Sequence, residues 1–252
     1  MKQIIRKWYK KLGFPTEWEF EFENLLESVK LYSCTLEEYN DKEDLARNLP
    51  MFLYFCEDVE KRYKELGIPE KVLLHTLSDI LLWTEMFKSI YGTLGLQETK
   101  WISRHLGLKL FRLGRLQFCM ADGELEIHIP KGDGMTPELC LDSIKKSKIF
   151  FKKYFPEFAY DKYTCDSWLL DETLLRFVKT DSNIAKFMKM FEIKERKESY
   201  SALKYVFRHD ARLENIRDFE PKSRMAAGIK EYVLAGGILY TGLGEIPADT
   251  IN

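Results

Sequence analysis

The 252-residue sequence lacks any apolar run of the roughly 20 residues that a helix needs to cross a bilayer. Its basic start, residues 1–11, is followed by neither an apolar stretch nor a small-residue cleavage site, so we expect no secretory signal. An excess of one charge is also missing, because 39 Lys and Arg nearly balance 40 Asp and Glu. We therefore expect a cytoplasmic protein with neither a nucleic-acid nor a membrane partner.

Paired cysteines are missing as well. The five cysteines are odd in number and form no CxxC pair, which favours free thiols in a reducing compartment. They are Cys34, Cys56, Cys119, Cys140 and Cys165. The Cys and His residues show no metal-ligand spacing along the chain, so we expect no bound metal.

The sequence does contain a change of periodicity. Aromatic residues make up 14% of the chain and occur along nearly all of it, which indicates a folded protein. Up to residue 106 the apolar spacing is helical, and from Arg112 it alternates. We predict an α+β (α/β-like) protein with a helical domain over residues 1–106 and a sheet domain over 107–252.

Within the helical half, the first predicted helix lies between Thr16 and Cys34. Pro50 fits the first turn of a helix that ends at Gly67. Pro69 opens another helix, which we expect to run unbroken to Gly92.

The stretch "RLQFCMADGELEIHIP" predicts a β-hairpin. Asp122 and Gly123 form a two-residue loop of the kind that suits a type I′ turn. This register places Phe118 opposite Ile127 on an apolar face. The other face carries polar residues, which are Arg115, Gln117, Cys119, Glu126 and His128.

The remaining elements follow from caps and alternation. Thr136 and Pro137 begin a helix that Pro156 ends. We predict a strand over residues 163–170, a helix capped by Asp181 or Ser182, a strand at "YSALKYVFR", a helix ending at Gly236 and Gly237, and a last strand at "ILYTGLG".

The junction "HIPKGDGMTPELC" between a strand and a helix permits two interpretations. Glycines let a backbone approach a phosphate closely, and a helix start favours anions. Lys131 adds positive charge, whereas Asp133 would repel a phosphate. The stretch matches no established phosphate-binding motif, so on these residues alone an ordinary capped turn is favoured.

Residues 107–244 resemble the C-terminal domain of a bacterial family of acyltransferases related to the GNAT N-acyltransferases. The resemblance is carried, in matching order, by "RLGRLQF", "LEIHIPKGDGMTPELCLDSIKKSKIFFKKYFPE", "TCDSWLLD", "DSNIAKFMKMF" and "LAGGILYTGLG". The first hundred residues are similar to the helical domain that accompanies it. The resemblance implies that the protein transfers an acyl group from acyl-CoA to an amine of a small molecule or peptide. Acetyl is the expected acyl group.

The resemblance implies a mixed sheet splayed into a V, with the CoA pyrophosphate on the loop after its fourth strand. That loop is Lys131 to Thr136 in this sequence. The candidate cofactor-binding residues are Ile129 just before the loop and, within it, Lys131, Gly132, Asp133, Gly134, Met135 and Thr136. Asn183 would contact the pantetheine arm. The loop departs from the usual Arg/Gln-x-x-Gly-x-Gly/Ala signature, and the connection over residues 208–235 is longer than the usual hairpin.

Acyl transfer to an amine needs a base for the ammonium and an acid for the thiolate. Glu126 and His128 are the candidate bases, and Cys165 and Ser167 the candidate acids. Three alternatives stay open: a solvated sheet face, a Cys119 or Cys165 nucleophile activated by His128, and an inactive CoA-binding or protein-interaction module.

Overall fold

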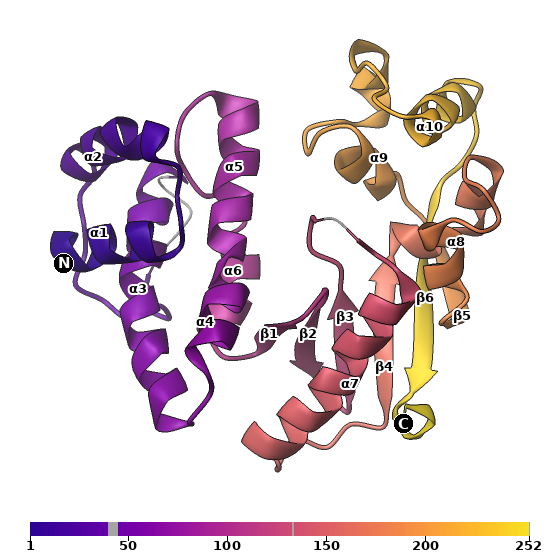
Figure 1. The fold of residues 1–252 in the computed structure, drawn as a ribbon. Coiled ribbons are helices and arrows are strands. Elements are labelled where there is room, and N and C mark those ends of the chain that lie inside the picture. The colour runs from indigo at the N-terminus through magenta and orange to yellow at the C-terminus, as the bar shows by residue number, and fades with distance from the viewer. Residues whose placement is uncertain (40–44, 133, 252) are drawn as a thin grey trace. The chain divides into compact units, whose positions relative to one another are not determined.

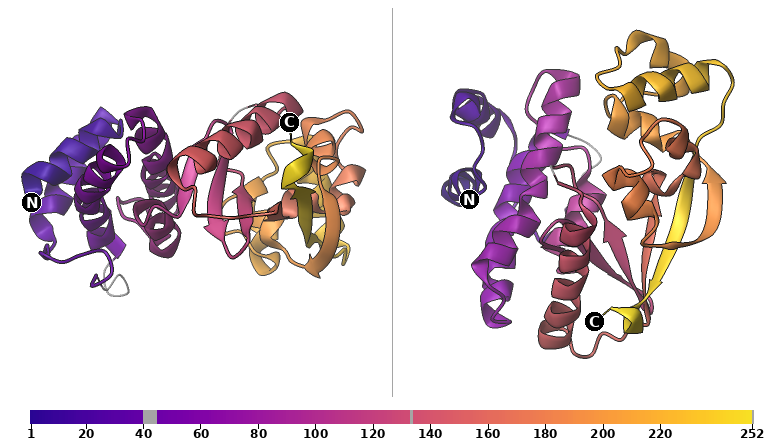
Figure 2. Two further views of the ribbon diagram at one scale, coloured as in Figure 1. Left: turned by 90° about the horizontal axis from the view of Figure 1, so that it is seen from below. Right: turned by 45° about the vertical axis from the view of Figure 1, so that its right-hand side comes forward.

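A computed structural model describes residues 1–39, 45–132 and 134–251 (Figures 1 and 2). The chain divides into two compact units, residues 1–113 and 114–252, and each is described by itself. Within the described ranges, no helix combines the length and apolar character that crossing a membrane requires.

The first unit is helical, as the periodicity predicts. Its α-helices are α1 (Lys2–Lys11), α2 (Glu19–Ser28), α3 (Leu45–Glu65), α4 (Glu70–Leu77), α5 (Asp79–Tyr91) and α6 (Thr99–Leu106). Trp8, Phe22, Phe52 and Tyr63 are buried in its core. Among the described residues the first strand is β1 (Leu110–Leu113), which lies beyond the predicted helical stretch.

Two expectations for this unit were wrong in detail. Pro50 is the sixth residue of α3, not part of its first turn, since the helix already begins at Leu45. The single helix predicted from Pro69 to Gly92 is broken into α4 and α5 at Ser78. The Ser78 hydroxyl donates to the carbonyl of His75 at 2.8 Å and so satisfies a helix end that the apolar spacing did not reveal.

The second unit is built on a mixed sheet, as predicted. Its strands are β2 (Leu116–Ala121), β3 (Glu124–His128), β4 (Lys162–Ser167), β5 (Glu192–Glu198) and β6 (Tyr240–Pro247). Within this unit the strand order is β2-β3-β4-β6-β5, with β3 and β4 parallel and the pairs β2–β3, β4–β6 and β5–β6 antiparallel. Its helices are α7 (Pro137–Tyr154), α8 (Asn183–Met188), α9 (Ser201–Val206) and α10 (Arg224–Leu234).

The predicted hairpin is confirmed in position and register. Gln117 pairs with His128, and Phe118 with Ile127. Gly123 has the positive φ of 72° that its turn requires. The buried Phe118 ring packs against Tyr163 of β4. The apolar face of the hairpin is therefore the core face, and the polar face lies on the opposite side of the sheet.

Helix α7 covers this core face (Figure 1). It begins where predicted, with Thr136 as its N-cap and Pro137 at its first position. The Ser147 hydroxyl of α7 donates to the Tyr163 hydroxyl at 3.2 Å. This contact joins α7 to β4 within the core.

The segment "YSALKYVFR" was wrongly predicted as a strand. It forms α9, and the strand instead precedes it as β5. Ala202 and Leu203 are buried in a cluster with Ile229 and Val233 of α10, so a helix buries them without a sheet partner. The strand predicted over residues 163–170 also ends early, because Trp168–Leu170 turn into a 3-10 helix.

The long connection between β5 and β6, which holds α9 and α10 (Figure 2), forms a small core together with Leu174 from the segment before β5. Buried Asp171, in the segment between β4 and β5, ties that segment to strands β5 and β6. One carboxylate oxygen accepts from Arg196 Nη2 on β5 at 3.0 Å, and the other accepts from the backbone N–H of Tyr240 on β6 at 3.0 Å. Asp171 also caps the following turn through the Thr173 N–H.

Candidate active site

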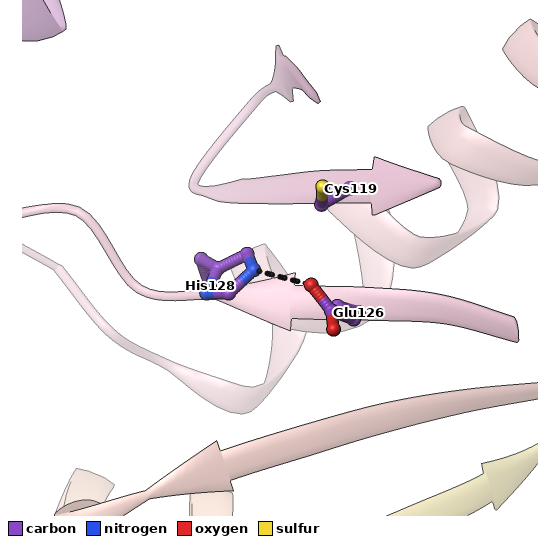
Figure 3. Close-up of side chains that lie close together, drawn as sticks. All are labelled: Cys119, Glu126 and His128. Atoms are coloured by element: carbon purple, nitrogen blue, oxygen red, sulfur yellow. Dashed lines mark hydrogen bonds and ion pairs between the residues drawn. The ribbon is translucent and has the colours of Figure 1, made fainter. Parts of the chain in front are cut away.

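The polar face of the hairpin brings the two candidate bases together. Glu126 and His128 are two residues apart on β3 and therefore project to the same side. Their side chains are 3.3 Å apart, from His128 Nε2 to Glu126 Oε2 (Figure 3). Both are about one-third exposed, at 34% for Glu126 and 29% for His128. Solvent or a substrate can thus reach a carboxylate and an imidazole that already interact.

Cys119 adds a thiol to this pair from the neighbouring strand. It is directly opposite Glu126 in the register, and its sulfur, a Glu126 oxygen and a His128 nitrogen all lie within 4.8 Å of one another. Its Sγ also lies 3.8 Å from the carbonyl oxygen of Met120. The predicted hairpin already places the three residues on one face, and the pairing of β2 with β3 brings their ligand atoms together.

The structure does not bring Cys165 to this face. Thr164 is the β4 partner of Glu126, so Cys165, the next residue, points to the opposite side of the sheet. There it is fully buried, and burial raises the pKa of its thiol. A thiol in that position has no direct contact with the Glu126–His128 pair, and its acid role loses its geometric basis.

Ser167 ends β4 and is half-buried. Its hydroxyl oxygen accepts the N–H of Leu169 at 3.2 Å and caps the 3-10 helix that follows. The hydroxyl has a structural role, and its proposed acid role stays a prediction.

The strands β3 and β4 pair over only part of their length. Their parallel register runs from Glu124 opposite Lys162 to Glu126 opposite Thr164. Both strands continue beyond this point, β3 to His128 and β4 to Ser167. Beyond this point the backbone groups of β3 and β4 no longer pair with each other. This interrupted pairing is the feature expected of a sheet that splays.

The loop after β3 combines exposure with a constrained backbone. Ile129, Met135 and Thr136 are half-buried, whereas Lys131, Gly132 and Gly134 are exposed. Asp133, also named from the sequence, lies outside the described residues. Gly134 has a φ of 70°, a conformation that favours glycine, and a Cβ there would lie 3.2 Å from Leu139 Cδ1.

The start of α7 is partly satisfied by its own side chains. Thr136 Oγ1 accepts from the N–H of Leu139 at 3.4 Å. Glu138 lies in the first turn, and hydrogen bonds with its own backbone N–H and Thr136 hold the pKa of its carboxyl below the usual value. Pro137 contributes no N–H. Any anion at this loop would therefore depend mainly on backbone N–H groups that precede the helix.

Arg115 is a residue of this site that sequence reasoning did not select. Its Nη1 donates to the carbonyl of Pro130 at 2.8 Å, and its Nη2 to the carbonyl of Gly132 at 3.3 Å. The guanidinium therefore fixes the loop to the start of β2. The only signal in the sequence was its place on the polar hairpin face.

Asn183 is the exposed first residue of α8, behind the N-cap Ser182. Helix α8 packs against α7. The ammonium of Lys186 on α8 contributes to the lowered pKa of the Glu138 carboxyl at the start of α7. Helix α8 therefore lies beside the first turn of α7, and the contact of Asn183 with the pantetheine arm stays a prediction.

Comparison with known protein families gives two matches that together span nearly the whole chain. Residues 4–108 match an N-acyltransferase N-terminal domain, and residues 110–246 match a GNAT-like C-terminal domain. None of the curated proteins compared matches the sequence.

Solved structures of similar fold are acyltransferases. One, in complex with decanoyl-CoA and teicoplanin, has a TM-score of 0.80 and 22% identity over 96% of this chain and 87% of its own. A second, an acyltransferase mutant in complex with octanoyl-CoA, has a TM-score of 0.81 and 21% identity over 98% of this chain and 88% of its own. The chain belongs to the acyltransferase family that joins an N-acyltransferase N-terminal domain to a GNAT-like C-terminal domain.

Proposed function

We propose that this protein transfers an acyl group from acyl-CoA to an amine, with the reaction centred on the polar face of the hairpin. The observation that carries the proposal is the Glu126–His128 pair beside the end of the β3–β4 ladder. The domain family supports the same reaction, and the fold is that of acyltransferases whose structures contain octanoyl-CoA or decanoyl-CoA.

In this proposal the CoA pyrophosphate is bound by the loop over residues 131–136, with Asn183 near the pantetheine arm. Backbone N–H groups of the loop donate to phosphate oxygens, and Lys131 adds a charge. Arg115 acts as a positioning residue, because it binds two loop carbonyls rather than the ligand. The N–H near Ile129 is a candidate donor to the thioester oxygen.

The pair Glu126 and His128 supplies the base. The imidazole takes a proton from the acceptor ammonium, and the carboxylate fixes which ring nitrogen is available. The amine then forms a bond to the thioester carbon, and the carbon–sulfur bond breaks as CoA leaves. Ser167 is the other candidate for protonating the thiolate, but it lies two residues after Cys165 on β4 and by the same alternation faces away from the Glu126–His128 pair.

The test is turnover with a panel of amines and of acyl-CoA donors from acetyl to decanoyl. Acetyl transfer is the expected case, whereas the two neighbouring structures contain longer chains. Formation of an N-acyl product with release of CoA supports the proposal. If every donor binds but none reacts, the chain is a CoA-binding module.

The alternative nucleophile is tested in the same assay. A Cys119 nucleophile would form a thioester with the enzyme, detectable as added mass after incubation with the donor alone. We expect no such adduct, because Glu126 and His128 alone account for proton removal.

A further inference from the structure

The same hairpin face presents three different metal-binding groups at one place. Cys119 offers a sulfur, Glu126 a carboxylate oxygen and His128 an imidazole nitrogen, and these atoms lie within 4.8 Å of one another (Figure 3). The thiol is buried and the other two side chains are about one-third exposed. An ion can therefore enter the site from solvent past Glu126 and His128, and the buried sulfur of Cys119 can bind it from the other side.

The spacing is close to that of a zinc site. Zinc bonds of about 2.3 Å to sulfur and about 2.0–2.2 Å to nitrogen or oxygen place neighbouring ligands roughly 3.3–3.7 Å apart in a tetrahedron. His128 Nε2 and Glu126 Oε2 already lie 3.3 Å apart. The sulfur would need to approach by at most about 1.3 Å, a movement that side-chain rotation can provide.

The types of ligand select the metal. Thiolate and imidazole favour borderline and soft ions, whereas Mg²⁺ and Ca²⁺ prefer sites made of oxygen atoms. Three protein ligands leave one tetrahedral position for water or another ligand.

We propose that Cys119, Glu126 and His128 form an inhibitory binding site for Zn²⁺ or a similar thiophilic divalent ion. On binding, the Cys119 sulfur forms a bond to the metal and its proton passes to the buffer. Because the ion binds His128 Nε2, the nitrogen that faces Glu126, the neutral imidazole then carries its proton on Nδ1. Nδ1 is the nitrogen that would accept a proton from the amine, so acyl transfer stops. This inhibitory consequence rests on the proposed function, whereas metal binding itself does not.

The test is calorimetric titration of Zn²⁺ into the reduced full-length protein. CoA is left out because its thiol would compete for zinc. We expect one ion per chain. The measured binding enthalpy should differ between buffers of unlike ionisation enthalpy, because the thiol releases a proton that the buffer takes up. Titration with Co²⁺ should also produce a sulfur-to-cobalt charge-transfer absorption.

Variants assign the ligands. Cys119→Ser should weaken zinc affinity at least about tenfold and remove the cobalt–sulfur absorption. His128→Gln, at a partly exposed position that threatens the fold less, should also weaken affinity. The matched control is Cys34→Ser, which alters a partly exposed thiol in the helical unit and should change neither measurement.

Three outcomes would overturn the binding site: no zinc binding by the wild type at micromolar concentration, equal binding by Cys119→Ser, or loss of binding in Cys34→Ser. If zinc binds through Cys119 but leaves an active enzyme uninhibited, the inhibitory role is wrong. If no acyl transfer is found at all, the proposed function fails while the calorimetric result still decides the metal site.

Discussion

At the scale of single residues, the Glu126–His128 pair carries the proposed chemistry. Replacing either by Gln removes a proton acceptor while nearly preserving side-chain volume. We expect kcat to fall by about 10²–10⁴, the usual contribution of a general base, with little change in CoA affinity. Steady-state kinetics and CoA titration of both variants measure this. Full activity in both single variants and in the double variant would make the pair an ordinary solvated surface.

Asp171 illustrates a residue whose role is to hold the fold. Its two carboxylate oxygens accept from Arg196, the Thr173 N–H and the Tyr240 N–H, and its side chain is 1% exposed. Asp171→Asn places an NH₂ group against one of these donors. We expect a loss of about 1–3 kcal/mol in unfolding free energy by denaturant titration. Asp166→Asn, on the exposed side of β4, is the control and should change stability little; equal effects would refute this role.

Glu60 in the helical unit provides a pH-dependent prediction. Its side chain is 8% exposed, and hydrogen bonds from Lys11 and Lys7 lower the pKa of its carboxyl to about 2. Because the folded pKa lies below the unfolded value near 4.5, its stabilising contribution is present above about pH 4.5 and is lost as pH falls toward 2.

Glu60→Gln should therefore lower the melting temperature at neutral pH and reduce its fall between pH 4.5 and 2. Calorimetric melting curves across this range measure both effects. An unchanged slope would mean that other carboxylates control acid unfolding.

The site was only partly predictable at this scale. Alternation placed Glu126 and His128 on one face with Cys119, because an Asp-Gly loop fixes the register. The role of Arg115 was not predictable, because its bonds to the carbonyls of Pro130 and Gly132 depend on the path of the loop. The side of the sheet that Cys165 faces was not predictable either, since it follows from the pairing of β3 with β4.

At the scale of elements, the hairpin turn is the feature most open to a local test. Gly123 has a φ of 72°, which a β-branched residue adopts only with strain. Gly123→Val should cost about 1–3 kcal/mol and lower the melting temperature. Gly123→Asn is the matched control, because Asn tolerates this conformation better. Equal melting temperatures for the two variants would contradict the proposed turn.

Local signals explain which elements the sequence revealed. Helix α7 was predictable from Thr136 and Pro137, whose capping chemistry acts within one turn. Strand β5 was missed because its side chains are mostly charged and exposed, and it pairs only with β6 at the sheet edge. Helix α9 was mistaken for a strand because its apolar residues are buried against α10, and no local sequence pattern predicts that contact.

At the scale of the whole molecule, the chain contains two family domains whose matched ranges meet near residue 109. The boundary predicted after residue 106 stays a prediction. The residues proposed for the chemistry all come from the sheet domain. We propose that the helical domain helps to bind the acceptor amine. For the second domain we propose that the loop over residues 131–136 binds the pyrophosphate of an acyl-CoA.

Calorimetric titration of CoA and of pantetheine, which lacks the pyrophosphate, tests this claim most directly. We expect wild type to bind CoA more tightly and Gly134→Val to lose most of that preference, because a side chain there strains the loop and crowds Leu139. Lys131→Ala should lose less, since its exposed charge adds only about 0.3–1 kcal/mol. Equal affinity of the wild type for the two ligands would contradict the account and leave this loop as a capped turn.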